Sequence, residues 1–124
     1  MGSSGAGKTT LLDVLSGRKN TGRITGDIFI SGKPLDKKKF RRTMGYVEQF
    51  DSLAPHDTAR EAVEFSAALR LPADTTAELR SQWVTTVLTL LELLPLENMM
   101  VGSAISGGMS FEQKKRVSIA VELA

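Results

Sequence analysis

Cysteine is absent from this chain of 124 residues, and histidine, tryptophan and tyrosine occur once each. The absence of cysteine excludes disulfides, thiolate metal sites and a cysteine nucleophile. No hydrophobic run approaches the roughly 20 residues that a membrane-spanning helix needs, so we expect this segment itself to be soluble. An excess of one charge sign is also missing, because the net charge is only +2. So small a net charge gives no argument for a nucleic-acid partner, and we expect none.

The clearest positive feature is a glycine-rich segment that fits the pattern G-x-x-x-x-G-K-[ST] at every fixed position. Glycines let the backbone curl so that successive N–H groups face an anion. The lysine can then reach the β- and γ-phosphates of a nucleotide, and the next hydroxyl can bind Mg²⁺. The predicted nucleotide-binding residues are Gly2, Ser3, Ser4, Gly5, Ala6, Gly7, Lys8, Thr9 and Thr10.

Hydrophobic periodicity and turn residues predict a mixture of helices and strands along the rest of the chain. We expect helices over residues 11–17, 58–70, 76–94 and 110–124, and strands over residues 23–30 and 43–48. Two of the helices begin with capping-box spacing, at Thr58 and at Ser110. We interpret residues 31–34 as a turn, the basic run 37–42 as a solvated connection, and residues 106–108 as a loop.

The helix predicted over residues 76–94 carries a hydrophobic stripe that is typical of a face turned to the core. Its members are Trp83, Val84, Val87, Leu88, Leu91 and Leu94. We therefore expect Trp83 to contribute to packing rather than to contact a cofactor. The single histidine, His56, is expected in an exposed loop, and Tyr46 within the second strand.

Taken in order, the phosphate loop, the two strands, Gln49 and the last helix resemble the nucleotide-binding domain of ATP-binding-cassette (ABC) transporters. Finer matches are similar to the G subfamily and its pleiotropic-drug-resistance-type full transporters. They are Gly5-Ala6-Gly7-Lys8-Thr9-Thr10-Leu11-Leu12-Asp13, Thr25-Gly26-Asp27-Ile28, Arg41-Arg42-x-x-Gly45-Tyr46-Val47-x-Gln49, Glu61-x-x-x-Phe65-Ser66-Ala67 and Lys115-Arg116-Val117-Ser118-Ile119-Ala120-Val121-Glu122-Leu123. The resemblance implies an α/β fold of the P-loop NTPase, ABC-ATPase type, with an antiparallel β segment and a helical subdomain.

The resemblance also divides the chain into three parts. They are residues 1–50 (phosphate loop, β segment and Q-loop), residues 51–109 (helical subdomain) and residues 110–124 (signature helix). The whole is most like the second, C-terminal nucleotide-binding domain of a full transporter. Only Met1 precedes the loop, and the family's Walker B carboxylates and switch histidine would follow residue 124. We therefore interpret the chain as a fragment and expect it not to hydrolyse ATP by itself.

The family's cofactors and partners follow from the same resemblance. It implies that ATP and Mg²⁺ bind, with Lys8 and Gln49 in catalytic roles and with Thr9 and Gln49 as ligands of Mg²⁺. It further implies a second nucleotide-binding domain, on the same polypeptide, and membrane-spanning domains as partners. Such a protein would lie at the cytosolic face of a membrane and power the export of lipids or xenobiotics.

Two registers are possible for the family's signature motif. Residues 105–108, Ile-Ser-Gly-Gly, look like its first four residues. Counting back from the basic stretch 114–116 gives the register that we prefer, which is Met109, Ser110, Phe111, Glu112 and Gln113. This signature is degenerate, because a bulky side chain and a carboxylate replace its two glycines. We expect the nucleotide site that it completes to be catalytically weak, and the site at residues 2–9 to be the competent one.

Two other functions are compatible with a phosphate loop. A nucleotide-binding module without turnover needs only the loop. A P-loop kinase would need an arginine-rich lid and an acceptor pocket, and it offers no place for the ordered Q-loop and signature-like helix.

Overall fold

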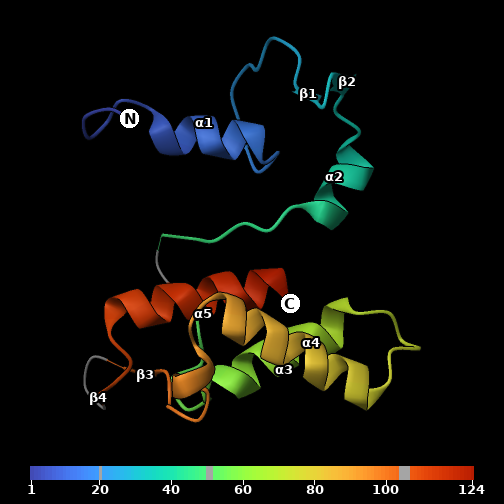
Figure 1. Ribbon diagram of the computed structural model, residues 1–124. Helices are drawn as coiled ribbons and strands as arrows, with labels where there is room; N and C mark the ends of the chain where they lie inside the picture. The colour runs from blue at the N-terminus through green and yellow to red at the C-terminus, as the bar shows by residue number, and fades with distance from the viewer. Residues whose placement is uncertain (20, 50–51, 104–106) are drawn as a thin grey trace. The chain divides into compact units, whose positions relative to one another are not determined.

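The computed structural model describes residues 1–19, 21–49, 52–103 and 107–124. The chain forms two compact units, Met1–Tyr46 and Val47–Ala124. Figure 1 shows the elements of each unit, coloured from the blue N-terminus to the red C-terminus. Within the ranges just given, no helix is both long enough and apolar enough to cross a membrane.

The first unit contains two helices with a small β-hairpin between them in sequence (Figure 1). Its elements are α1 (Lys8–Leu15), β1 (Phe29–Ile30), β2 (Lys33–Pro34) and α2 (Lys37–Thr43). The strands pair antiparallel through a turn at Ser31 and Gly32, whose φ angles are 50° and 75°. Two positive φ angles are what a two-residue type I′ turn requires. The predicted turn over residues 31–34 is therefore confirmed at residues 31–32, whereas residues 33–34 form β2.

The two strands predicted for this unit are largely wrong. Of residues 23–30, only Phe29 and Ile30 form a strand, and residues 44–48 have no regular secondary structure. Met44 is extended, with φ −98° and ψ 125°, as its sequence context favoured. An extended segment becomes a strand only when a neighbour pairs with it, and in the described part of the chain no strand pairs with residues 44–48.

The helices of the first unit also differ from expectation. Helix α1 begins at Lys8 rather than at residue 11, so the lysine of the phosphate loop lies in its first turn. The basic run is not a loop but helix α2, because the Asp36 carboxylate accepts hydrogen bonds from the backbone N–H groups of Lys38 (2.9 Å) and Lys39 (3.4 Å). A carboxylate in this position satisfies free N–H groups and stabilises a helix start.

The second unit is built around three helices. Its elements are α3 (Ala59–Arg70), α4 (Ala77–Leu90), the 3₁₀ turn η1 (Leu94–Leu96), β3 (Gly102–Ser103), β4 (Gly107–Gly108) and α5 (Phe111–Leu123). Helix α3 packs against both α4 and α5, as Figure 1 shows. The core between them is mostly Ala, Val and Leu: Ala59, Val63, Ala67, Val84, Val87, Leu88, Leu93, Val117 and Ala120.

Both predicted capping boxes are confirmed. At the start of α3, the Thr58 hydroxyl accepts from the N–H of Glu61 at 3.2 Å, and the Glu61 carboxylate accepts from the Thr58 N–H at 2.8 Å. The Glu61 carboxylate also accepts from the Thr58 hydroxyl at 2.8 Å. The bonds from the Thr58 N–H and hydroxyl lower the pKa of Glu61, because they favour its ionised form. At the start of α5, the Ser110 hydroxyl and the Gln113 side chain make the equivalent pair of bonds.

Helix α4 ends four residues earlier than predicted. The N–H of Leu93 donates to the carbonyl of Leu88 (2.8 Å), and that of Glu92 donates to Thr89 (3.1 Å). This is the Schellman arrangement, in which the residue after the cap adopts a left-handed conformation. Glu92 does so, with φ 57°.

The hydrophobic stripe of α4 is only partly in the core. Val84, Val87 and Leu88 are buried as predicted, but Trp83 is 44% exposed. The stripe could not continue to residue 94 because the helix ends first, and Leu94 begins η1.

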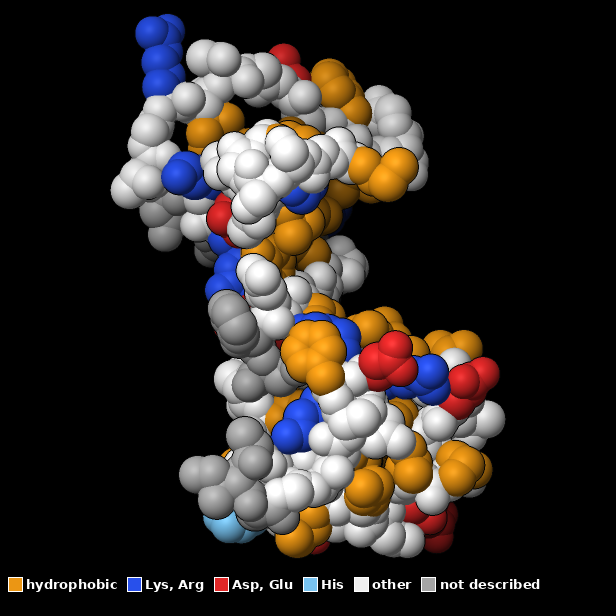
Figure 2. All heavy atoms as spheres, turned by 90° about the vertical axis from the view of Figure 1, so that its left-hand side faces the viewer, with side chains coloured by type: hydrophobic (Ala, Val, Ile, Leu, Met, Phe, Trp, Pro, Cys, Tyr) orange, Lys and Arg blue, Asp and Glu red, His pale blue; other side chains and the backbone are white. Residues whose placement is uncertain are grey.

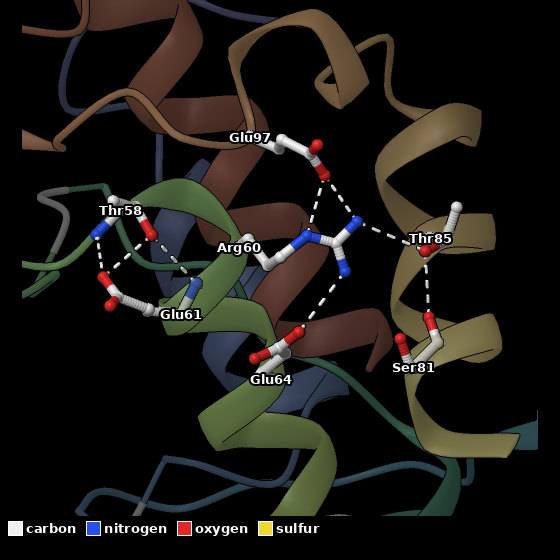
Figure 3. Close-up of polar contacts among 7 residues, drawn as sticks. All are labelled: Thr58, Arg60, Glu61, Glu64, Ser81, Thr85 and Glu97. Atoms are coloured by element: carbon white, nitrogen blue, oxygen red, sulfur yellow. Dashed lines mark hydrogen bonds and ion pairs between the residues drawn. The ribbon is translucent and has the colours of Figure 1, made fainter. Parts of the chain in front are cut away.

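Arg60 connects three segments of this unit (Figure 3). Its guanidinium donates to Glu97 beside η1, with the Nε bond at 2.7 Å, to Glu64 on α3 at 3.3 Å, and to the Thr85 hydroxyl on α4 at 3.3 Å. The hydrogen bond with Glu97 is the main reason that the pKa of Arg60 is raised. Because these partners come from different elements, Arg60 fixes how α3, α4 and η1 pack together.

Residues 107–108 are not the loop expected there, because they form strand β4, which pairs antiparallel with β3. Ser106 lies outside the described residues. The pairing of β3 with β4 requires glycine at position 102, because a Cβ atom there would lie 1.7 Å from the carbonyl oxygen of Gly107. The hairpin therefore brings the chain to Met109, whose N–H donates to Val101 at 3.0 Å, directly before α5.

Candidate functional site

The glycine-rich segment at residues 2–7 forms a tight loop that leads into α1. Gly5 and Gly7 have φ angles of 80° and 83°, which side-chain-bearing residues rarely adopt. Apart from each glycine and its neighbours along the chain, no heavy atom lies within 4 Å of where a Cβ would stand on either of them. Glycine is thus needed here for backbone conformation, and the space beside both residues is open.

The side chain of Lys8 turns back onto this loop. Its ammonium group donates to the carbonyl oxygens of Gly2 (2.7 Å) and Ser3 (2.6 Å). The loop, Lys8 and the first residues of α1 are all exposed. A cationic group held by the loop at the positive end of a helix is an arrangement that attracts anions.

Tyr46 anchors the chain that leads to Gln49. It does not lie in a strand; its hydroxyl donates to the carboxylate of Asp13 on α1 at 2.9 Å. The Arg18 guanidinium lies 4.1 Å from the centre of its ring, which is a cation–π distance. Tyr46 is therefore a structural residue of the first unit.

Gln49, the predicted Q-loop residue, is exposed and lies in a bend of the second unit. Its backbone is held from α5, because the Lys115 ammonium donates to the carbonyl oxygens of Glu48 (2.7 Å) and Gln49 (3.2 Å). The phosphate loop belongs to the first unit, so Gln49 and this loop lie in different units.

The preferred signature segment, residues 109–113, covers the start of α5. Met109 is buried, whereas Phe111 is 70% exposed at the first helical position. The Ser110 hydroxyl is the N-cap of the helix, and Glu112 lies exposed in the first turn. In the alternative register, Ile105 and Ser106 lie outside the described residues.

Hydrophobic side chains reach the surface of both units, among charged ones, on the face shown in Figure 2. Phe29, Phe65, Leu69, Leu90 and Phe111 are each at least 60% exposed. In contrast, the ranges that the structure describes contain no cluster of three or more histidine or acidic side chains able to hold a metal ion. His56 is exposed, as expected.

Sequence reasoning treated Lys114 and Lys115 only as a basic stretch, and it missed that Lys115 contacts the predicted Q-loop residue. Lys115 holds the backbone at Glu48 and Gln49, and Lys114 donates to the carbonyl of Gly102 at 3.0 Å. Lys115 and Gln49 are 66 positions apart, and no local pattern reports such a contact.

Comparison with known proteins gives consistent matches. The family model described as ABC transporter matches residues 1–124. The chain is 51% identical over 123 residues to the ABC transporter G family member 44 of Oryza sativa subsp. japonica, covering 99% of this chain and 8% of that protein. It is also 51% identical over 123 residues to the ABC transporter G family member 31 of Arabidopsis thaliana, covering 9% of that protein. The chain thus spans less than a tenth of the length of these relatives.

Proposed function

The chain belongs to the ABC transporter family, and from this premise we propose that residues 2–9 bind the triphosphate of ATP within an ATPase that powers transmembrane transport. The observation that carries the proposal is the position of Lys8, whose ammonium group lies against the loop carbonyls of Gly2 and Ser3. A phosphate entering the loop would meet this charge, the N–H groups of the loop and the N-terminus of α1.

Mg²⁺ would be held by the hydroxyl of Thr9 and the side-chain oxygen of Gln49. The donor chemistry fits, because Mg²⁺ prefers hard oxygen ligands and usually keeps several waters and phosphate oxygens beside them. When bound, it neutralises charge on the phosphates. Lys8 supplies a second positive charge at the transferring phosphate, and Gln49 orients the attacking water by hydrogen bonding.

The wider assembly is also proposed from the family. This chain would act with a second nucleotide-binding domain on the same polypeptide and with membrane-spanning domains, at the cytosolic face of a membrane. Lipids or xenobiotics are the cargo that we propose for it. The similarity to G family transporters supports this assignment.

The direct test is a calorimetric titration of the 124-residue chain with ATP in the presence of Mg²⁺. We expect Lys8→Ala to weaken binding by about tenfold or more, because it removes charge-assisted hydrogen bonds to phosphate. Lys33→Ala, an exposed lysine on β2 of the same unit, is the matched control and should bind like the parent chain. Equal affinities for the two variants would contradict the proposal.

The degenerate signature makes a separate prediction for a complete transporter that carries this sequence. Phe111 and Glu112 would face the γ-phosphate held by the partner domain, where bulk and negative charge oppose close approach. We expect Phe111→Gly combined with Glu112→Gly to increase hydrolysis at the site completed by this signature. Trapping of nucleotide at each of the two sites separately measures hydrolysis at each site. If both sites of the unaltered transporter hydrolyse ATP equally, the register 109–113 is wrong.

A further inference from the structure

Lys115 on α5 joins the signature helix to the backbone of Gln49. Its ammonium group donates to two consecutive carbonyls, those of Glu48 at 2.7 Å and Gln49 at 3.2 Å. The Cα atom of Gln49 lies between these two carbonyls. A group that binds both of them restricts the backbone dihedral angles of Gln49. The contact therefore acts on the direction in which Gln49 points.

Helix α5 is a firm support for this contact. Val117 and Ala120 are fully buried in the core. The Ser66 hydroxyl on α3 donates to the carbonyl of Val121 at 2.7 Å, and Arg70 pairs with Glu122 at 2.9 Å. Because α5 is fixed to α3 along its second half, Lys115 holds Gln49 relative to a rigid helix rather than to a loop.

The same helix begins with the predicted signature residues. Ser110 caps it, and Lys115 follows Ser110 by five positions, somewhat more than one helical turn. A displacement of the first turns of α5 would therefore be transmitted to the backbone at Gln49 through the Lys115 side chain.

We propose that Lys115 is a positioning residue for ATP hydrolysis, which couples the placement of Gln49 to the signature helix. The inference rests on the proposed function, because it gives Gln49 its role at the nucleotide. The bonded residues Glu48 and Gln49 are exposed, so water can replace the ammonium group when Lys115 is changed. Loss of Lys115 should then disturb turnover much more than folding.

The chain provides a matched control in the next residue. Lys114 has the same charge and length and also donates to a backbone carbonyl, but its partner is Gly102 in β3. Lys115→Met and Lys114→Met remove the same charge from the same helix. Only the first releases the backbone at Gln49. Lys115→Arg keeps a long cationic donor and serves as the conservative variant.

The experiment measures kcat and KM for ATP in a complete transporter that carries this sequence. We expect Lys115→Met to lower kcat about fivefold or more with a smaller change in KM, because Gln49 orients the attacking water in addition to its contact with Mg²⁺. Lys114→Met and Lys115→Arg should stay within about twofold of the parent. In a Gln49→Ala background, Lys115→Met should have no further effect, since the two residues act through one group. Lys115→Met should leave the thermal midpoint close to that of the parent, because the carbonyls that it releases are exposed.

A second measurement tests directly whether Lys115 restrains the backbone at Gln49. Hydrogen exchange of the 124-residue chain should be faster at residues 47–49 in Lys115→Met and unchanged there in Lys114→Met. Equal kcat values for the two methionine variants, or additive losses with Gln49→Ala, would overturn the inference while leaving the proposed function intact. Failure of the unaltered transporter to hydrolyse ATP would overturn both.

Discussion

Glu92 and Ser31 are the two residues other than glycine that have positive φ angles in the described part of the chain. Glu92 has φ 57° at the end of α4, a position that glycine usually takes, and its carboxylate pairs with Arg116 at 3.1 Å. The pair is exposed and therefore contributes little. The missing glycine also explains why the helix end was mispredicted: without it, the hydrophobic stripe appeared to continue to Leu94.

Substitution at position 92 tests this interpretation. Glu92→Gly and Glu92→Ala both remove the pair with Arg116, but only glycine adopts a left-handed conformation without strain. We expect the glycine variant to be more stable than the alanine variant by about 1 kcal/mol in urea unfolding. Alanine is ordinarily the better residue in a helix. An alanine variant as stable as the glycine variant would thus refute the left-handed assignment.

At the scale of elements, the starts of α3 and α5 were predictable, whereas α2 was missed and the neighbours of each element in space were not predictable. Capping boxes that begin at Thr58 and Ser110 predict the starts of α3 and α5, and each needs only four consecutive residues. Residues 44–48 have the composition of a strand, but pairing depends on a partner elsewhere in the chain. The loop at residues 2–7 was also readable locally, whereas the contact of Lys115 with Gln49 was not.

The buried face of α4 offers a matched pair of leucines. Leu88 is fully buried between the helices, and Leu90, two positions later, is 71% exposed. We expect Leu88→Ala to destabilise the second unit by about 2–5 kcal/mol, because it removes buried contacts and leaves a cavity. Leu90→Ala should change stability by less than about 0.5 kcal/mol. Denaturant unfolding monitored by circular dichroism gives the stability of each variant. Similar losses of stability in the two variants would contradict the packing described for α4.

At the scale of the whole molecule, hydrophobic burial is unevenly divided. All the hydrophobic core residues belong to Val47–Ala124, and of the described side chains in Met1–Tyr46 only Ser16 is buried. The first unit, which carries the phosphate loop, is therefore stabilised mainly by local hydrogen bonds and by the contact of Tyr46 with Asp13. A ligand that binds only the folded form stabilises it by mass action, by about 2.7 kcal/mol at a hundredfold excess over Kd.

Hydrogen exchange with and without MgATP is the measurement that tests the central claim most directly. Without nucleotide, the amides of residues 2–12 should exchange rapidly, because the loop and the start of α1 are exposed. MgATP should slow these amides in the parent chain, and at the same concentration it should slow them much less in Lys8→Ala. If MgATP leaves residues 2–12 unprotected in the parent chain, or protects them equally in Lys8→Ala, then residues 2–9 are not a triphosphate site.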